Sequence, residues 1–255
     1  MQEPYQWQNN DQGYSVGLPL THAKRPDHPR RQALEGQYCT LQPLDARKHA
    51  RQLHDANKLD ADGSIWTYLP YGPFAKLTDY QSWLSDSATS IDPIFFTILE
   101  RETGEAVGLL SYLRVNPAAG SIEVGHICLS PKAQRTRLAT EALFLLMSNA
   151  FALGYRRFEW KCDALNRGSR AAAERLGLSF EGVFRQATHY KGRNRDTAWF
   201  AATDQDWATL KPAFEHWLAQ DNFDEAGHQI SSLSKLTAPV LHLRFSDWPL
   251  ASKLP

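Results

Sequence analysis

The chain has 255 residues with 28 basic and 28 acidic side chains, so its formal net charge is +0. A hydrophobic share of 42% suffices for a packed core and excludes a largely disordered chain. The charge balance argues against a general grip on nucleic acid or acidic membrane, and no apolar run approaches the roughly 18–20 residues of a membrane helix.

The first half of the chain begins with an arm and then alternates short strands and helices. Residues 1–33 contain glycine, proline and clustered basic residues without apolar periodicity, so we expect an extended or disordered arm. A short strand is expected over residues 38–44, followed by a helix to about residue 59 with Asp45 as its N-cap. An aromatic stretch broken by proline and glycine covers residues 66–74, and helical spacing predicts a second helix over about 76–89.

The second half has the pattern of a sheet crossed by helices. Residues 94–100, 106–115 and 121–129 predict three strands of an antiparallel meander, and a helix over 136–153 closes at Gly154. A strand over 157–163 completes a β-α-β crossover. A short helix over 166–176 comes next, then strands over about 179–190 and 197–203 that flank a hairpin tip at 191–195, and an amphipathic helix over 206–218.

These elements predict an α/β (α+β) protein with one main domain. We expect an arm over residues 1–33, the domain over 34–205, an added helix over 206–220 and a polar tail over 221–255. No internal repeat or low-complexity tract is visible.

The segment after the third meander strand has the features of an anion site. A strand that runs through a tight polar loop into a helix leaves backbone N–H groups unpaired, and the helix dipole adds to their attraction for a pyrophosphate. Arg135 and Arg137 add positive charge to this loop. An ordinary turn with solvated basic residues is the alternative interpretation.

Two motifs in this region resemble the GCN5-related N-acetyltransferase (GNAT) family. Gln134 and Ala139 fill the ends of the family's coenzyme-A loop, (Gln/Arg)-x-x-Gly-x-(Gly/Ala), although Arg137 stands where the family usually has glycine. Residues 163–178, with Asn166 and Ser169, are similar to the Asn-x-x-Ser…Leu-Gly-Phe segment of the ribosomal-protein N-terminal acetyltransferase branch. Residues 180–186 resemble the Phe-x-x-Glu-Gly of that branch. The resemblance covers roughly residues 34–206.

This resemblance implies the fold, the reaction and the coenzyme contacts. The fold would be a mixed, mostly antiparallel sheet flanked by helices, with the β-α-β crossover binding the coenzyme. The reaction would be direct transfer of an acetyl group from acetyl-CoA, as co-substrate and without a metal, to a primary amine. The residues that would bind acetyl-CoA are Ile127, Cys128, Leu129, Gln134, Arg135, Thr136, Arg137, Leu138, Ala139 and Asn166.

Acyl transfer to an amine also needs a proton acceptor for the ammonium and a proton donor for the thiolate. Glu123 is the first candidate for the base, because it lies eleven residues before Gln134, the spacing found in histone-type members; a solvent-facing or paired glutamate is the alternative. His126 is the second candidate, because histidine titrates near neutrality. Ser169, by its match to the ribosomal-type branch, and Tyr190 are the candidates for the thiolate's acid.

The acceptor pocket of the family lies between the early helices and the late hairpin. Trp66, Tyr68, Tyr71 and Phe74 occur where its wall would be, and aromatic walls suit an amine. These rings are equally suited to packing the helix pair against the sheet. The expected acceptor is a small-molecule amine or a protein N-terminus. Members of the ribosomal-type branch can have a carboxylate at the position of Thr188. Its absence here argues against assuming that this protein has the same acceptor as that branch.

Other functions have weaker support. The histidines lack metal-ligand spacing, and no phosphate loop or Rossmann glycine set is present. A non-catalytic acyl-CoA-binding sensor is one alternative, supported by the departure at Arg137. A ribosome- or RNA-associated protein, using Arg30, Arg31, Arg193 and Arg195, is another. The three cysteines show no disulfide pattern, and the polar N-terminus lacks signal-peptide features. These observations predict a cytoplasmic protein. A homodimer is a further open prediction.

Overall fold

The computed structural model describes residues 6–20 and 25–254. The main sheet consists of β3 (Leu34–Glu35), β4 (Cys39–Pro43), β5 (Ile94–Glu100), β6 (Ala106–Asn116), β7 (Ser121–Leu129), β8 (Arg157–Asp163), β9 (Ser179–Tyr190) and β10 (Arg193–Thr203). The helices are α1 (Ala46–Asn57), α2 (Leu77–Thr89), α3 (Arg137–Ala152), α4 (Arg167–Arg175), α5 (Asp204–Leu218) and α6 (Leu233–Thr237). The expected strands and helices up to α5 are therefore confirmed.

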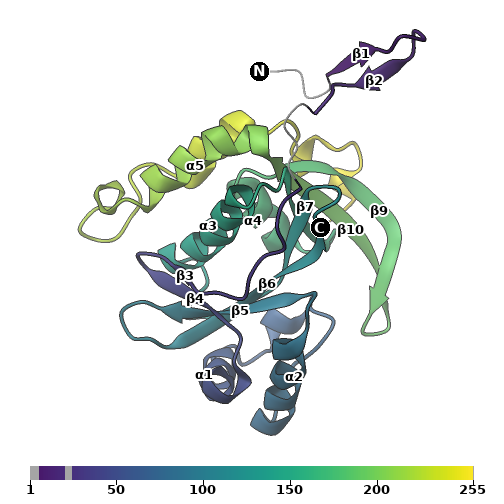
Figure 1. Cartoon of the computed structure of the whole chain (residues 1–255). Helices are drawn as coiled ribbons and strands as arrows, with labels where there is room; N and C mark the ends of the chain where they lie inside the picture. The colour runs from purple at the N-terminus through teal and green to yellow at the C-terminus, as the bar shows by residue number, and fades with distance from the viewer. Residues whose placement is uncertain (1–5, 21–24, 255) are drawn as a thin grey trace.

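The eight strands form one sheet in the order β3-β4-β5-β6-β7-β8-β10-β9. The pair β7–β8 is parallel, and the other neighbours are antiparallel. Helix α3 makes the crossover between the two parallel strands (Figure 1). This is the predicted mixed, mostly antiparallel sheet with one β-α-β unit.

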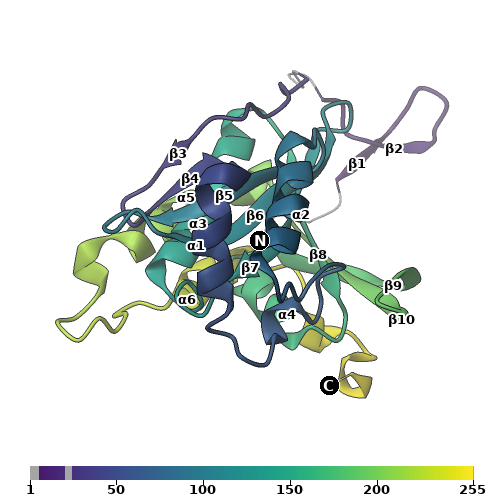
Figure 2. The same ribbon diagram turned by 90° about the horizontal axis from the view of Figure 1, so that it is seen from below.

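Helices cover both faces of the sheet because its strands are apolar on both. Along β5, Ile94 and Phe96 belong to one core cluster and Phe95 to the other, as the period of two requires. The cluster around Phe95 includes α1 and α2, which Figure 2 shows in front of the sheet. The cluster around Ile94 and Phe96 includes side chains of α3, α4 and α5.

Local signals fix the ends of the helices. Asp45 caps α1, as predicted, by accepting hydrogen bonds from the amides of Arg47 and Lys48. After α3 and α4 the chain turns through Gly154 and Gly177, whose φ angles of 93° and 84° lie in the left-handed region that favours glycine.

The two ends of the chain differ in their packing. At the start, β1 (Trp7–Asn9) and β2 (Ser15–Gly17) pair as an exposed hairpin that projects from the body (Figure 1), so this part of the predicted arm is locally ordered. Basic Lys24 of the arm lies outside the described residues. None of the helices in the described part of the chain has both the length and the apolar character needed to cross a membrane.

The prediction of a polar tail over residues 221–255 is wrong. Leu233, Val240 and Phe245 of this segment are buried in the larger core cluster, and Phe245 packs against Phe180 of β9 at 5.1 Å between ring centroids. The apolar residues there are spaced irregularly between polar ones, so no period of two or 3.6 marks them in the sequence.

The late hairpin also differs from expectation at its tip. The turn consists of Lys191 and Gly192, and residues 193–195 belong to β10 rather than to a basic tip. Lys191 Nζ donates to the carbonyl oxygen of Trp66 at 2.7 Å, which joins the hairpin to the connection between α1 and α2.

Candidate functional site

The two parallel strands diverge inside the sheet. Their register pairs run from Ser121 with Arg157 to Val124 with Trp160, which is the last pair. Both strands continue for several residues beyond this point, to Leu129 in β7 and Asp163 in β8. A gap therefore opens between their carboxyl ends.

A bulge in β7 accompanies this divergence. Gly125 pairs with Ser111 of β6 and Cys128 pairs with Leu109, so three steps along β7 lie opposite two along β6. His126 lies inside the bulge with a φ of 51°. A bulge bends its strand and increases the local twist, which directs the end of β7 away from β8.

A cavity of about 950 Å³ occupies the gap. Its walls come from β6 to β10, from the starts of α3 and α4, and from residues 64–70 of the connection between α1 and α2. Several residues predicted to bind the coenzyme or to act in catalysis line it: Glu123, Ile127, Leu129, Gln134, Arg135, Asn166, Ser169 and Tyr190.

One end of the cavity is formed by the loop before α3. Gln134 Nε2 donates to the carbonyl oxygen of Leu129 at 3.0 Å, which ties the loop to the end of β7. Thr136 caps α3 by accepting from the amide of Ala139 at 3.2 Å. The first-turn amides of a helix have no intrahelical partner, so this end suits an anion. Arg135, exposed and with a φ of 60°, adds its charge there.

Three of the predicted coenzyme contacts have side chains directed into the protein. Cys128 is buried in the cluster with α1 and α2, and Leu138 and Ala139 of α3 are buried in or beside the other core. Only their backbone atoms are available to a ligand.

Arg137, at the family's glycine position, does not extend its guanidinium into the cavity. Its Cζ atom lies 4.9 Å from the ring centroid of Tyr38 and 4.4 Å from that of Phe223. This side chain therefore binds the C-terminal segment to the start of the sheet. Arg137, one of the residues expected to bind acetyl-CoA, is therefore not in the lining of the cavity, and its contact with the coenzyme stays a prediction.

The opposite wall of the cavity is the start of α4. Asn166 is its N-cap and accepts from the amide of Ser169 at 3.0 Å. Ser169 Oγ accepts from Trp160 Nε1 at 2.9 Å. The Ser169 hydroxyl also lies within hydrogen-bond reach of the Cys162 thiol, whose pKa this contact lowers against the larger effect of burial.

Tyr190 extends from β9 into the same cavity. Its hydroxyl donates to Asp163 Oδ2 at 2.8 Å, and burial followed by this bond raises its pKa above the ordinary value. Cys162 also lines the cavity, and burial raises the pKa of its thiol to about 11. The thiol therefore stays protonated at neutral pH, which does not favour a cysteine nucleophile.

Glu123 is held by two cations. Its carboxylate accepts from Arg114 Nε at 2.7 Å, from Arg114 Nη2 at 3.0 Å and from Lys161 Nζ at 2.8 Å. The side chain is only 2% exposed. A carboxylate has about four lone-pair sites, so most of those on Glu123 are occupied before an amine arrives. The paired-glutamate alternative of the sequence is the observed state.

Arg114, Lys161 and Arg195 line the cavity but were not among the predicted site residues. Lys161 Nζ also lies 2.9 Å from Glu159 and 3.8 Å from the ring centroid of Trp199. Because side chains alternate between the two faces of a strand, the sequence could have placed these cations on the same face of the sheet as Glu123. Which side chains they contact depends on the register between strands, which the sequence does not reveal.

His126 faces the same space in the neutral form. Its Nδ1 lies 3.2 Å from the hydroxyl of Tyr71, and the two rings stack with centroids 5.7 Å apart. Burial, and then the charges of Arg114 and Arg195, lower the pKa of His126 to about 4. At neutral pH its imidazole is therefore unprotonated.

The predicted aromatic wall serves mainly as core. Trp66 is 5% exposed and packs edge-on against Phe74 at 5.5 Å, and Tyr71 packs on Trp83 at 4.1 Å. Tyr68 alone of the four predicted rings lines the cavity, and its hydroxyl donates to the carbonyl oxygen of Leu165 at 3.2 Å. Trp66 and Phe74 therefore pack in the core, as the alternative interpretation predicts. Tyr71 does not line the cavity itself but contacts His126, which does.

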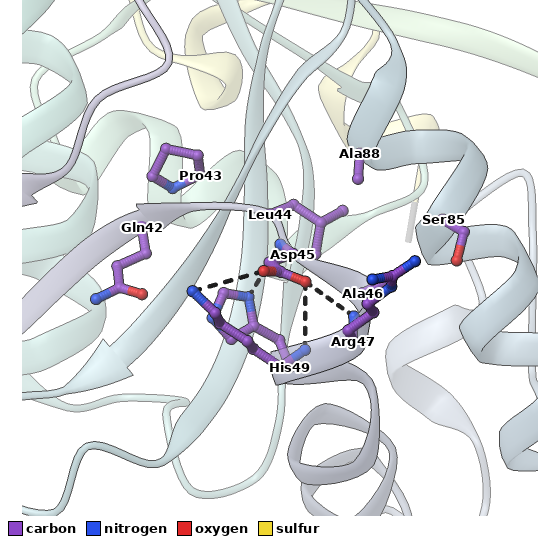
Figure 3. A pocket seen from close by; sticks show the side chains of 10 residues that line it. Gln42, Pro43, Leu44, Asp45, Ala46, Arg47, His49, Ser85 and Ala88 are labelled. Atoms are coloured by element: carbon purple, nitrogen blue, oxygen red, sulfur yellow. Dashed lines mark hydrogen bonds and ion pairs between the residues drawn. The ribbon is translucent and has the colours of Figure 1, made fainter.

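A second hollow, of about 510 Å³, lies at the start of α1 (Figure 3). Its polar groups bond to one another, because Asp45 accepts from the amides of Arg47 and Lys48 and its own amide donates to His49 Nδ1 at 3.2 Å. The residues that the sequence predicted for the site do not line this hollow. Residues 6–20 and 25–254 contain no group of three or more His, Cys, Asp or Glu side chains arranged to hold a metal ion.

Comparisons with known proteins agree with this geometry. The family model described as an acetyltransferase (GNAT) domain matches residues 39–179. A solved GCN5-related N-acetyltransferase from Brucella melitensis is 42% identical with a TM-score of 0.82, over 84% of this chain and 97% of that one. The uncharacterized N-acetyltransferase p20 of Bacillus licheniformis is 25% identical over 164 residues, which are 62% of this chain and 92% of the relative. The ribosomal L7/L12 acetyltransferase RimL, 21% identical with a TM-score of 0.58 over 67% of this chain and 93% of that one, shares the fold.

Proposed function

The chain belongs to the GNAT acetyltransferase family, which transfers acetyl groups from acetyl-CoA, and on this premise we propose that the cavity between β7 and β8 carries out that reaction on a primary amine. The observation that carries the proposal is the divergence of the two parallel strands at Val124 and Trp160, beside the start of α3. The acceptor is the amine of a small molecule or an exposed protein N-terminus.

The coenzyme extends along the cavity from the loop before α3. Its pyrophosphate lies at the first-turn amides of α3, with Arg135 as the side chain that adds charge. Backbone groups of Ile127 to Leu129 pair with the pantetheine arm and polarise the thioester carbonyl. Asn166, on the opposite wall, closes the channel. These assignments are supported by the lining of the cavity.

His126 takes the proton that the amine loses as it attacks the carbonyl carbon. Its neutral imidazole faces the cavity, whereas Glu123 already accepts from Arg114 and Lys161. Glu123 acts instead as a positioning residue that fixes both cations. When the carbon–sulfur bond breaks, the Ser169 hydroxyl, whose oxygen is oriented by Trp160, donates a hydrogen bond to the departing thiolate, and the proton that the amine has lost to His126 balances the charge of that thiolate. Tyr190 is the alternative donor, although its proton is directed at Asp163.

We propose that the protein functions in the cytoplasm, and a homodimer stays a prediction from the sequence. The location is supported by three cysteines that are buried and unpaired, as expected in a reducing compartment.

Calorimetric titration with acetyl-CoA and release of free thiol across an amine panel test this function. We expect binding in the wild type and thiol release with at least one class of amine. His126→Asn should lower kcat about 100-fold and leave the acetyl-CoA Kd within about threefold, because a general base contributes to the chemical step. His228→Asn is the matched control, since His228 is 80% exposed outside the cavity.

Each alternative has its own outcome. No heat with acetyl-CoA overturns the coenzyme assignment, and binding without turnover of any amine supports the sensor. If Glu123→Gln lowers kcat as far as expected for His126→Asn, while His126→Asn retains wild-type kcat, the base is Glu123. Salt-dependent retention of RNA on a filter, without acetyl-CoA binding, supports the RNA-associated alternative.

A further inference from the structure

We propose that the acceptor amine also carries an anionic group, a carboxylate or a phosphate, and that Arg195 binds this group. The inference rests on the proposed function, because it concerns the acceptor end of the same cavity. Arg195 is then a substrate-binding residue that determines specificity.

The carboxylates that line the cavity are already engaged. Glu123 accepts from Arg114 and Lys161, as described above. Asp163 accepts from the amide of Leu165 at 2.9 Å and from the Tyr190 hydroxyl at 2.8 Å. Glu123 is therefore neutralised by two cations, whereas Asp163 accepts only from uncharged donors.

The lysine and arginine side chains of the lining outnumber these carboxylates. Arg114 and Lys161 pair with Glu123, and Arg135 lies in the loop assigned to the coenzyme phosphates. The fourth cation is Arg195 of β10. Its Nε donates to Thr197 Oγ1 at 3.1 Å. Among the residues that the structure describes, no carboxylate lies within salt-bridge distance of its guanidinium.

Arg195 acts on the interior of the cavity. The side chain is half-buried, and alternation along β10 places it on the same face as Thr197 and Trp199, which also line the cavity. Its charge contributes, after burial and Arg114, to the lowered pKa of His126. The guanidinium is therefore close to the group assigned to accept the amine's proton.

This arrangement selects a class of amine. A half-buried guanidinium that lacks an anion gains from a ligand that supplies one, and its planar fork matches both carboxylate and phosphate. A polyamine would add positive charges to a lining in which four cations already face two carboxylates. A nearby cation also favours the neutral, nucleophilic form of an amine, as a like charge does for any titrating cation.

Pairs of amines in which one member carries an anionic group and the other lacks it test the proposal. The panel contains amino acids with their carboxamides, phosphoethanolamine with ethanolamine, and spermidine, each assayed for thiol release from acetyl-CoA. We expect kcat/KM at least tenfold higher for the anionic member of the preferred pair, and the two kinds of pair distinguish carboxylate from phosphate. Arg195→Gln should remove this preference, so that kcat/KM for the two members of the pair lies within about threefold of each other. Arg193→Gln, an exposed arginine of the same strand, is the control.

A binding measurement makes the test independent of turnover. N-acetylated amino acids and N-acetylphosphoethanolamine are titrated into protein saturated with CoA, and Arg195→Gln should weaken the tighter ligand at least tenfold. Equal binding by wild type and variant overturns the inference, as does a preference for spermidine or the carboxamides. A switch of donor, in which wild type prefers succinyl-CoA and Arg195→Gln prefers acetyl-CoA, would assign the anion to the acyl group instead. Failure of the proposed function itself differs, because no acetyl-CoA binds.

Discussion

Arg135 and Arg137 lie two residues apart at the start of α3, and their side chains have different surroundings. Arg135 is exposed and lines the cavity beside the first-turn amides. Arg137 lies between the rings of Tyr38 and Phe223. The departure from the family's glycine therefore belongs to the packing of the C-terminal segment rather than to the coenzyme loop.

Substitution of each arginine by alanine should separate these roles. Arg135→Ala should weaken acetyl-CoA binding about tenfold, the lower end for a charge-assisted hydrogen bond at an exposed site, and change stability little. Arg137→Ala should lower the free energy of unfolding by about 1–2 kcal/mol through two lost cation–π contacts, with the Kd for acetyl-CoA within about threefold. Calorimetry and urea unfolding measure the two quantities. A weaker Kd in Arg137→Ala alone would return that side chain to the phosphate site.

His126 makes the stability of the fold depend on pH. Its pKa in the folded protein, about 4, lies below the ordinary 6.5, so between these values the unfolded chain binds a proton that the folded chain does not. The contribution of His126 to the free energy of unfolding is therefore fully present above about pH 6.5, and it is lost as the pH falls toward 4.

Between pH 7 and pH 5 this loss should be about 2 kcal/mol larger in wild type than in His126→Asn. Asparagine suits the test because it tolerates the positive φ at this position and does not titrate. Urea unfolding at the two pH values gives the difference. Parallel losses in both proteins would show that His126 is not held neutral by the fold.

At the scale of elements, Glu141 joins α3 to the start of β4. Its carboxylate is buried and accepts from the amides of Gln37 at 2.6 Å, Tyr38 at 2.7 Å and Cys39 at 2.8 Å. Gly36 packs directly against it, since a Cβ there would lie 2.4 Å from Glu141 Oε2. The helix at the proposed anion site is therefore fixed to the turn between β3 and β4.

Glu141→Gln should lower the free energy of unfolding by about 2–4 kcal/mol, because an amide group replaces one acceptor of a buried charge-assisted set. Gly36→Ala should cost about 1–3 kcal/mol by overpacking the same contact. Gly17→Ala is the control, because a Cβ at Gly17 meets nothing within 4 Å. Chemical unfolding measures the free energy of unfolding of each variant. If Gly36→Ala leaves this free energy almost unchanged, the close packing of Gly36 against Glu141 is refuted.

Patterns in the sequence were sufficient for the helices and strands from β4 to α5 apart from some of their ends, and insufficient for the two ends of the chain and for side-chain partners. The apolar runs of β5 and β7 and the capping residue Asp45 are local signals, and the structure agrees with them. The contacts of Glu123 and Glu141 join segments that only the folded sheet brings together, so a period of two or 3.6 cannot reveal them. The same limit explains why the sequence leaves Trp66 open between pocket wall and core, whereas the structure places it in the core.

For the whole molecule, the equal numbers of acidic and basic residues do not describe the charge of the site. The cavity is lined by Arg114, Arg135, Lys161 and Arg195 against Glu123 and Asp163. A net charge of +0 therefore coexists with a local excess of cations where the coenzyme and the acceptor are proposed to bind. The uneven distribution of charge fits binding of anionic small molecules without a general affinity for polyanions.

The two ends of the chain should respond differently to deletion. Every strand residue of the N-terminal hairpin is exposed, so removal of residues 1–20 should leave the Tm within about 2 °C of the full chain. Removal of residues 220–255 takes away Leu233, Val240 and Phe245 and uncovers Phe180 and Trp217.

Each large apolar side chain involved in the C-terminal deletion contributes about 1.5–3 kcal/mol by burial, and their sum is comparable to the 5–15 kcal/mol that stabilises a typical domain. We therefore expect the shortened protein to lose its cooperative thermal transition and its near-ultraviolet circular dichroism, while the N-terminal deletion retains both. Phe245→Ala in the full chain provides a milder test, with an expected loss of about 3 kcal/mol. A cooperative transition of the C-terminal deletion near the wild-type Tm would mean that the segment only covers a core that is stable without it.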